Sequence, residues 1–367
     1  MKFALHMLWI GLVVIGLGSP TALAAPFHKA PAPLFPVQTV IADRQSDEIY
    51  PSIAGNYLVY SLRKSHQFAV ARVSVDAATA SGRGIVPNQP KEAVRYGVAL
   101  GDGSIGYVSN RMGPISAWMR QARGDGHVAI ANMATFNGGV MPMNLKASHN
   151  GRFWCFDSSM DKKRRSKVLN DFTDGYIHTE LIGQSWRMYH SDSFRFKQGY
   201  NPTKSGNRNE FAPPLLFIFD RSSSQLTMIP NALNGSISPD GKRIAFAREI
   251  NGNYDLWMQN MDGSNLTQLT NSSYGEFEPA WSPDGKKLAF ASNRDSNGHV
   301  LHTSIYIMDI SSGRSRRLTN APKATDGGPA WKDTTTVLFH SNRSPTKPQA
   351  TTVGDWNIWQ VSFKGAL

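Results

Sequence analysis

Apolar and polar residues alternate in short runs along most of the chain, a pattern that predicts β-strands. The clearest runs belong to a unit that occurs twice, at residues 237–247 and 281–291. In each copy an apolar residue leads into Ser-Pro-Asp-Gly, and an Ala-Phe-Ala run follows after three further residues. Proline presets φ at the first turn position, aspartate bonds to its own backbone, and glycine adopts positive φ. Each copy therefore predicts a β-hairpin with a buried outgoing strand.

The same unit recurs in weaker form throughout the chain. Aligned on the Asn or Asp of the turn, seven copies lie 42 to 49 residues apart, at Asn56, Asp102, Asn150, Asp192, Asp240, Asp284 and Asp333. Ser-Asn-Arg follows the second strand in three copies, and two further strands complete a typical unit. Four short strands in a repeat of this length predict a blade of a β-propeller. The expected fold is an all-β propeller of seven four-stranded blades, or of six if the weak copy at Asp192 is not a blade.

The two ends of the repeat region complement each other. The last unit stops after its third strand, at 358–363, and a single strand at 37–42 precedes the first complete unit. We predict that strand 37–42 completes the last blade and closes the ring, because closure removes two exposed sheet edges. The propeller domain is accordingly predicted to span residues 37–367.

The N-terminal segment has the pattern of a secretory signal. Lys2 precedes the apolar run 3–18, and Ala22-Leu23-Ala24 offers a small-residue cleavage site. We predict a signal peptide over 1–24 and a Pro-rich linker over 25–36, with an uncleaved N-terminal anchor as the alternative. The expected location is the periplasm, or the exterior, with no integral membrane segment after cleavage.

Cysteine content and charge limit the chemistry. Cys155 is the only cysteine, which excludes an intramolecular disulfide and a Cys-based metal site, and its apolar neighbours predict a core position. The formal charge is +12. Because exported proteins seldom meet nucleic acid, this charge indicates either solubility or an anionic envelope partner. The basic run Lys162–Lys167 is a candidate for binding an anionic polymer or a solvated loop, and the polar stretch 197–214 is either a functional loop or a tolerated insertion.

The two Ser-Pro-Asp-Gly-Lys units, Glu278-Pro279-Ala280-Trp281 and Ser292-Asn293-Arg294 resemble the WD-type propeller repeats of the TolB family. The resemblance is strong over about 235–345 and weak over 48–230. It implies six blades preceded by an α/β domain, whereas this chain has a short linker and seven candidate units. Similar repeats occur in prolyl-peptidase-type enzymes and oligogalacturonate lyases. The first of these needs a Gly-x-Ser-x-Gly elbow, which this sequence lacks.

Candidate binding residues come from the first strand of each unit, which lines the channel of a propeller. The residues six positions before each aligned turn residue form a mixed aromatic and polar set suited to a peptide or sugar: Tyr50, Tyr96, Asn144, Trp186, Asn234, Glu278 and Gly327. Packing between blades is the alternative role for this set. Asp240 and Asp284 are interpreted as turn formers and not as acids or bases.

A metal site is the alternative chemistry. His149, His178 and His190, with Gln184, could hold a divalent metal such as Mn near the axis, as the resemblance to oligogalacturonate lyases implies. The sequence as a whole favours an exported, non-catalytic scaffold without a cofactor that binds an envelope protein or peptide at the channel mouth. The second hypothesis is a polysaccharide-active or sugar-binding propeller with a metal at its axis.

Overall fold

A computed structural model gives the fold of the chain. The described residues are 35–43, 46–64, 67–75, 86, 92, 94–111, 115–123, 126–131, 142–158, 178–182, 185–189, 214–250, 253–298, 302–320, 323–344 and 353–364. The predicted signal peptide, the basic run Lys162–Lys167 and the stretch 197–213 lie outside these residues. Within the described part no helix is long and apolar enough to cross a membrane.

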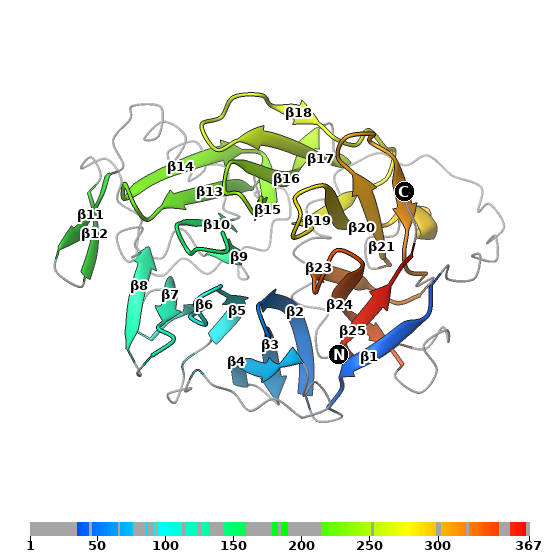
Figure 1. The fold of residues 1–367 in the computed structure, drawn as a ribbon, viewed down its shortest axis with the longest axis horizontal. Helices are drawn as coiled ribbons and strands as arrows, with labels where there is room; N and C mark the ends of the chain where they lie inside the picture. Colours follow the sequence, from blue (N-terminus) through cyan, green and yellow to red (C-terminus); the bar gives the residue numbers. More distant parts are fainter. Residues whose placement is uncertain are drawn as a thin grey trace, which may run out of the picture.

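Six antiparallel sheets surround a common axis, with their first strands innermost (Figure 1). We number these sheets as blades 1 to 6 in chain order. Blade 1 holds β2 (Ser46–Ala54), β3 (Tyr57–Lys64) and β4 (Gln67–Ser74). Blade 2 holds β5 (Val94–Ala99), β6 (Ile105–Ser109), β7 (Ser116–Arg120) and β8 (His127–Ala131). Blade 3 is built on β9 (Met143–Ala147), β10 (Phe153–Ser158), β13 (Leu215–Asp220) and β14 (Gln225–Pro230).

The second half of the ring is more regular. Blade 4 holds β15 (Ala232–Ile237), β16 (Arg243–Ile250), β17 (Asn253–Asn260) and β18 (Thr267–Gln268). Blade 5 holds β19 (Glu276–Trp281), β20 (Lys287–Ser292), β21 (Ser304–Asp309) and β22 (Ser315–Arg317), with the short 3₁₀ helix η4 (Arg294–Ser296) after β20. Blade 6 holds β23 (Asp326–Trp331), β24 (Thr336–Arg343), β25 (Val353–Ser362) and β1 (Val37–Ile41).

The all-β propeller prediction is confirmed, and the preference for seven blades is wrong. The expected fourth unit lies inside blade 3, where β10 pairs with β13 across the insertion 159–214. Within that insertion, β11 (His178–Ile182) and β12 (Ser185–Tyr189) form a hairpin that extends the outer edge of the same sheet beyond β14. The insertion is about as long as one repeat, so the spacing of turn residues stays regular across it. The spacing of the turn residues therefore predicted one blade too many.

Closure of the ring by the N-terminal strand is confirmed. β1 pairs antiparallel with β25, with Val37 opposite Val361 and Thr39 opposite Trp359 (Figure 1). Ile41 is buried between blades 6 and 1. Two segments from opposite ends of the chain thus share one sheet.

The core is divided among the junctions between blades. Six main apolar clusters each join two neighbouring blades, and one of them, with Leu58, Ala71 and Ile358, joins blade 6 back to blade 1. Cys155 is fully buried between blades 3 and 4, as predicted, and its thiol donates to the Gly235 carbonyl at 3.3 Å. A blade buries its faces only against its neighbours, so the ring is stable as a closed set.

The turns between first and second strands have the predicted chemistry. In blade 4, Asp240 Oδ1 accepts from Ser238 Oγ at 2.6 Å and from the Lys242 N–H at 3.1 Å, while Gly241 adopts φ +69°. These hydrogen bonds, led by that from Ser238, lower the pKa of Asp240. Blade 3 repeats the pattern with Asn150 in place of aspartate. These residues are turn formers.

The repeated Ser-Asn-Arg motif also has a structural role. Its arginine, at the end of the second strand, pairs with a buried acid near the start of the first: Arg294 with Glu276 at 2.6 Å in blade 5, and Arg343 with Asp326 in blade 6. In blade 2, Arg111 lies 3.6 Å from Glu92. The motif therefore ties together the ends of two strands on the face of the ring opposite the turns.

Candidate functional site

The axial site begins with a backbone irregularity that all six blades share. Each first strand contains a β-bulge, where two residues oppose one on the second strand. The first bulged residue has a left-handed conformation in every blade: Tyr50 (φ 54°), Tyr96 (54°), Asn144 (51°), Asn234 (55°), Glu278 (54°) and Gly328 (55°). This conformation suits glycine and is unusual for bulky residues. Five of the six positions nevertheless carry a side chain.

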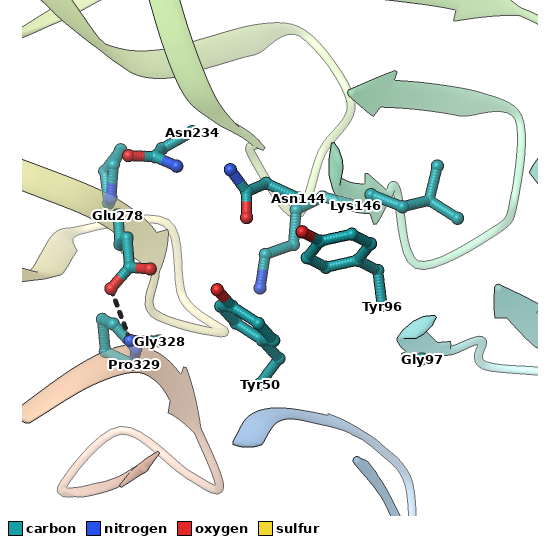
Figure 2. Close-up of a pocket in the computed structure, with 11 residues that line it drawn as sticks. Tyr50, Tyr96, Gly97, Asn144, Lys146, Asn234, Glu278, Gly328 and Pro329 are labelled. Carbon is teal, nitrogen blue, oxygen red and sulfur yellow. Dashed lines mark hydrogen bonds between the residues drawn. The ribbon is translucent and has the colours of Figure 1, made fainter. Parts of the chain in front are cut away.

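These six positions line one cavity on the axis of about 400 Å³, a volume that includes space open to solvent (Figure 2). Gly97, Leu145, Lys146, Pro279 and Pro329 complete its walls. Side chains from blades 1 to 5 and a glycine from blade 6 thus converge on a single space.

Most of the sequence-predicted channel residues lie at this cavity. Tyr50, Tyr96, Asn144, Asn234 and Glu278 are all in its lining. In blade 6 the equivalent residue is Gly328, one position after the predicted Gly327, because the turn after Trp331 is one residue shorter than the turn after Trp281. The two tryptophans mark the equivalence, since each indole donates to a carbonyl of the preceding blade, at 3.0 Å from Trp281 and 2.9 Å from Trp331.

Trp186 lies elsewhere. It belongs to β12, at the edge of the blade 3 sheet opposite the innermost strand β9. The prediction assigned it to the first strand of an additional blade, and that blade does not exist. The structure therefore separates Trp186 from the other five.

Polar side chains on second strands support the bulges of the next blade. Asp157 Oδ1 accepts the Asn234 N–H at 3.2 Å, and its other oxygen accepts from Asn144 Nδ2 at 2.9 Å. His340 Nδ1 accepts the Tyr50 N–H at 3.3 Å, and Ser61 Oγ accepts the Gly97 N–H at 3.4 Å. Blades 3, 6 and 1 thereby fix the bulges of blades 4, 1 and 2.

Burial shifts the pKa of two of these side chains, Asp157 and His340. It raises the pKa of Asp157 to about 7, against the hydrogen bonds that favour its charged form. It lowers the pKa of His340 to about 3, so this imidazole is neutral near pH 7. Since Nδ1 accepts from Tyr50, the His340 proton resides on Nε2.

Glycine is required at the sixth position by the same histidine. A Cβ on Gly328 would lie 2.5 Å from His340 Nδ1 and 2.7 Å from Cε1. The Gly328 N–H donates to Glu278 Oε2 at 2.6 Å, so blade 5 fixes the bulge of blade 6 through a residue of the cavity wall (Figure 2). The imidazole also packs edge-on against the Tyr50 ring, with centroids 5.1 Å apart. His340 therefore fills the space that a sixth side chain would use.

Lys146 is the most prominent lining residue that sequence reasoning missed. It follows the bulge of β9, and Figure 2 shows its amine pointing into the middle of the cavity, between Tyr50, Tyr96 and Glu278. Burial lowers its pKa, while the nearby Glu278 carboxylate favours the charged form. Among the described residues its amine makes neither a hydrogen bond nor an ion pair.

Asp157 and His340 were also missed, although the sequence holds a signal for both. Each is a polar residue at the end of an apolar run, Phe153-Trp154-Cys155-Phe156 before Asp157 and Val337-Leu338-Phe339 before His340. Such a polar residue on a buried strand needs a specific partner. The signal for Lys146 is weaker, because alternating strands commonly carry lysine on an exposed face.

The proposed metal ligands are not brought together in the described part of the chain. His149 is exposed in the turn between β9 and β10, whereas His178 opens β11 and pairs with Gln225 on β14. Three strand spacings separate β10 from β11, roughly 14 Å, which is too far for two ligands of one metal ion. Gln184 and His190 lie outside the described residues. Within those residues no group of three His, Cys, Asp or Glu could hold a metal, and the metal alternative stays a prediction.

The class of the protein follows from this geometry: it is a six-bladed β-propeller with a polar and aromatic site on its axis. The sequence model described as "TolB beta propeller domain" matches residues 236–366, which span blades 4 to 6. Blades 4 to 6 are therefore similar in sequence to the TolB propeller repeats.

One curated relative and several solved structures are similar. The Tol-Pal system protein TolB of Anaeromyxobacter dehalogenans (strain 2CP-C) is 39% identical over 62 residues, which cover 17% of this chain and 14% of that protein. A putative TolB structure from Agrobacterium tumefaciens has 15% identity and a TM-score of 0.49, covering 90% of this chain and 97% of that one. An oligogalacturonate lyase in complex with manganese has 12% identity and a TM-score of 0.49, with 92% and 95% covered.

Proposed function

We propose that this chain is an exported, non-catalytic β-propeller that binds a protein or peptide partner at the mouth of its axial channel. The observation that carries the proposal is the set of five side chains held in a left-handed conformation around one cavity. Such a conformation costs on the order of 1–2 kcal/mol per residue, and glycine would avoid that cost. Local strain of this kind is typical of functional sites.

A binding role fits the chemistry of the cavity better than a catalytic one. The two carboxylates at or behind its wall hold backbone N–H groups of neighbouring blades, Glu278 that of Gly328 and Asp157 that of Asn234. His340 likewise accepts a backbone N–H from Tyr50. Among the described lining residues there is no serine, cysteine or histidine to serve as a nucleophile with an adjacent base. Groups that fix the backbone in this way support a preformed binding site.

Export and the nature of the partner rest on the sequence. The charge, apolar run and cleavage motif of residues 1–24 support secretion, with periplasmic or extracellular location of the folded ring. The matched relative is a Tol-Pal system protein, so we expect the partner among cell-envelope proteins. An anionic envelope polymer bound by Lys162–Lys167 would be a further partner.

The test of this proposal is peptide binding by the chain purified from the periplasm of a Gram-negative host. Randomised peptides are selected against the wild-type chain and measured by titration calorimetry. We expect one peptide per chain, with affinity reduced at least tenfold in Tyr96→Ala. The matched control is Tyr57→Ala, which removes a tyrosine that is 42% exposed and lies outside the cavity lining. Equal loss in both variants, or none in either, would contradict a channel-mouth site.

The polysaccharide-active alternative predicts different measurements on the same preparation. Stoichiometric Mn, Fe or Zn in the purified chain, lost in His149→Ala or His190→Ala, would favour an enzyme and contradict the non-catalytic proposal. Intact mass of the periplasmic chain tests the export step, since cleavage after Ala24 is expected.

A further inference from the structure

We propose that the axial cavity recognises a free carboxylate, supplied by the C-terminus of the bound peptide, with Lys146 as its principal ligand. This inference rests on the proposed function and adds the chemical group that the site selects. It is carried by the position of the Lys146 amine and by the division of the cavity wall into hydrogen-bond donors and acceptors.

A lysine at position 146 is unfavourable for the free energy of folding. The Lys146 side chain is half-buried inside the ring, where burial lowers the pKa of its amine, and among the described residues nothing accepts a hydrogen bond from it. Burial of an ammonium group without a partner is unfavourable, and an apolar side chain would fill the same space at less cost. The fold of β9 does not require the charge, since this strand is already fixed by its pairing with β10. An anionic ligand would supply the missing partner.

Two hydroxyl groups accompany the amine. Tyr50 and Tyr96 contact each other through their rings, with centroids 5.2 Å apart, and both line the cavity beside Lys146. Burial raises the pKa of both tyrosines, so each keeps its proton and can donate. Among the described residues neither hydroxyl has a hydrogen-bond partner. Three donors on one side match a carboxylate, which accepts several hydrogen bonds through two oxygens.

The opposite side of the cavity presents acceptors. Asn234 Oδ1 is buried and makes no hydrogen bond within the described part of the chain. Glu278 lies beside it, with Oε2 accepting from Gly328. The donors come from blades 1, 2 and 3, and the acceptors from blades 4 and 5 (Figure 2). A peptide C-terminus has the complementary polarity, because its carboxylate and its last amide N–H project from the same residue.

The single positive charge argues against a phosphate ligand. A dianion needs more than one cation or a set of backbone N–H groups, whereas this wall offers Lys146 alone and places Glu278 nearby. A monoanionic carboxylate places one negative charge beside the one ammonium group, and burial raises the pKa of Glu278, which reduces its repulsion of this ligand. The shared chemistry is therefore a carboxylate, from either a chain terminus or an acidic side chain, and we commit to the terminus because of the adjacent acceptors.

The experiment uses two peptide libraries, one displayed with free C-termini and one with free N-termini and tethered C-termini. We expect binders from the first library. Each binder is then synthesised as a C-terminal acid and as the corresponding carboxamide, and both are titrated into the wild type and Lys146→Met. The wild type should prefer the acid at least tenfold, whereas Lys146→Met should bind both forms with equal, weak affinity. This double comparison isolates the contact between the amine and the carboxylate.

Two further variants keep the result interpretable. Lys286→Met removes an exposed lysine in the turn after Asp284 and should leave the preference for the acid unchanged. Tyr96→Phe removes one hydroxyl and should weaken the acid severalfold more than the carboxamide. The melting temperature of Lys146→Met should equal or exceed that of the wild type, because the variant no longer buries an ammonium group.

Three outcomes would overturn the inference. Equal affinity of acid and carboxamide in the wild type would remove the carboxylate contact while leaving channel-mouth binding intact. Loss of binding only when an internal Asp or Glu of the peptide is changed to Asn or Gln would assign the carboxylate to a side chain. A melting temperature several degrees lower in Lys146→Met would make Lys146 a structural partner of Glu278. If neither library yields a binder sensitive to Tyr96→Ala, the proposed function itself fails.

Discussion

In blades 1 to 5, each first strand has one left-handed residue at its bulge and another in the turn that follows it, and the two sets differ sharply in composition. In the turn that follows the strand, the residue is glycine in blades 1 to 5: Gly55, Gly103, Gly151, Gly241 and Gly285. In the bulge that faces the axis, the residues of the same blades are Tyr50, Tyr96, Asn144, Asn234 and Glu278. All ten residues have a positive φ, between 51° and 84°.

The comparison separates scaffold from site. At all five turns the left-handed residue is glycine, which adopts this conformation at the lowest cost in free energy, so no side chain is needed there. At all five bulges the left-handed residue is not glycine, so its conformation destabilises the fold, and the side chains differ from blade to blade. A uniform backbone with varied side chains is the arrangement of a binding ring on a rigid frame. The regular Ser-Pro-Asp-Gly hairpins therefore belong to the frame.

The largest expected effect tests whether both sets depend on a closed ring. Deleting residues 37–42 removes β1, exposes the outer edge of β25 and opens the apolar cluster between blades 6 and 1. We expect the free energy of unfolding to fall by about 5 kcal/mol or more, or the cooperative transition to be lost. Thermal and denaturant unfolding measure this, and a deletion of 28–33 in the Pro-rich segment is the length-matched control. An unchanged melting temperature would mean that β1 does not hold the ring together.

The next effect tests why one bulge has no side chain. Gly328→Ala would place a Cβ within 2.5 Å of His340 Nδ1 in a left-handed backbone, so we expect a loss of about 3 kcal/mol. Gly313→Ala is the matched control, because Gly313 has φ +67° and no atom within 4 Å of its Cβ position. Its free energy of unfolding should fall by about 1 kcal/mol, the effect of placing alanine in a left-handed backbone.

A double variant sharpens this result. His340→Ala clears the space beside residue 328, so Gly328→Ala should cost about 1–2 kcal/mol less in that background than in the wild type. Additive losses would show that His340 is not the reason for glycine at this position. Chemical denaturation of the four chains completes the cycle.

The frame was largely predictable from sequence because turns are local. Proline, aspartate and glycine at fixed positions define a hairpin with no knowledge of its neighbours, and the complementary chain ends predicted β1 as the closing strand. The number of blades, in contrast, depends on pairing between strands that are far apart in the sequence. Whether 159–214 forms a blade or an insertion depends on β10 pairing with β13, and spacing carries no information about that pairing.

The site was predictable only where it shares the period of the frame. Tyr50, Tyr96, Asn144, Asn234 and Glu278 lie in register with the turns, so counting back from each turn found them. Lys146 lies two residues after Asn144 on the same strand, whereas Asp157 and His340 lie on second strands. The roles of all three depend on side-chain direction and on the adjacent blade. Contacts between blades are long-range and leave no regular trace in the sequence.

The smallest expected effects test the comparison between turn and bulge directly. Gly285→Ala leaves room for the new Cβ, because the nearest atom is 3.8 Å away. The only unfavourable effect is the left-handed backbone, with φ +66°, so the free energy of unfolding should fall by about 1 kcal/mol. Asn234→Gly is the reverse exchange at the other end of a first strand. It relieves the left-handed strain and removes a buried oxygen without a partner among the described residues, but it increases the entropy of the unfolded chain. We expect its stability to stay within about 1 kcal/mol of the wild type.

Binding should respond in the opposite sense to stability in this pair. Gly285→Ala leaves the cavity wall intact and should bind a selected peptide with unchanged affinity. Asn234→Gly removes one of the acceptors opposite Lys146 and should weaken the same peptide at least fivefold, since its Oδ1 then no longer pairs with the ligand N–H. Denaturant unfolding and calorimetric titration on the two variants give both quantities. A large loss of stability in Asn234→Gly with unchanged affinity would mean that the bulge side chains serve packing between blades, and the distinction between frame and binding ring would then fail.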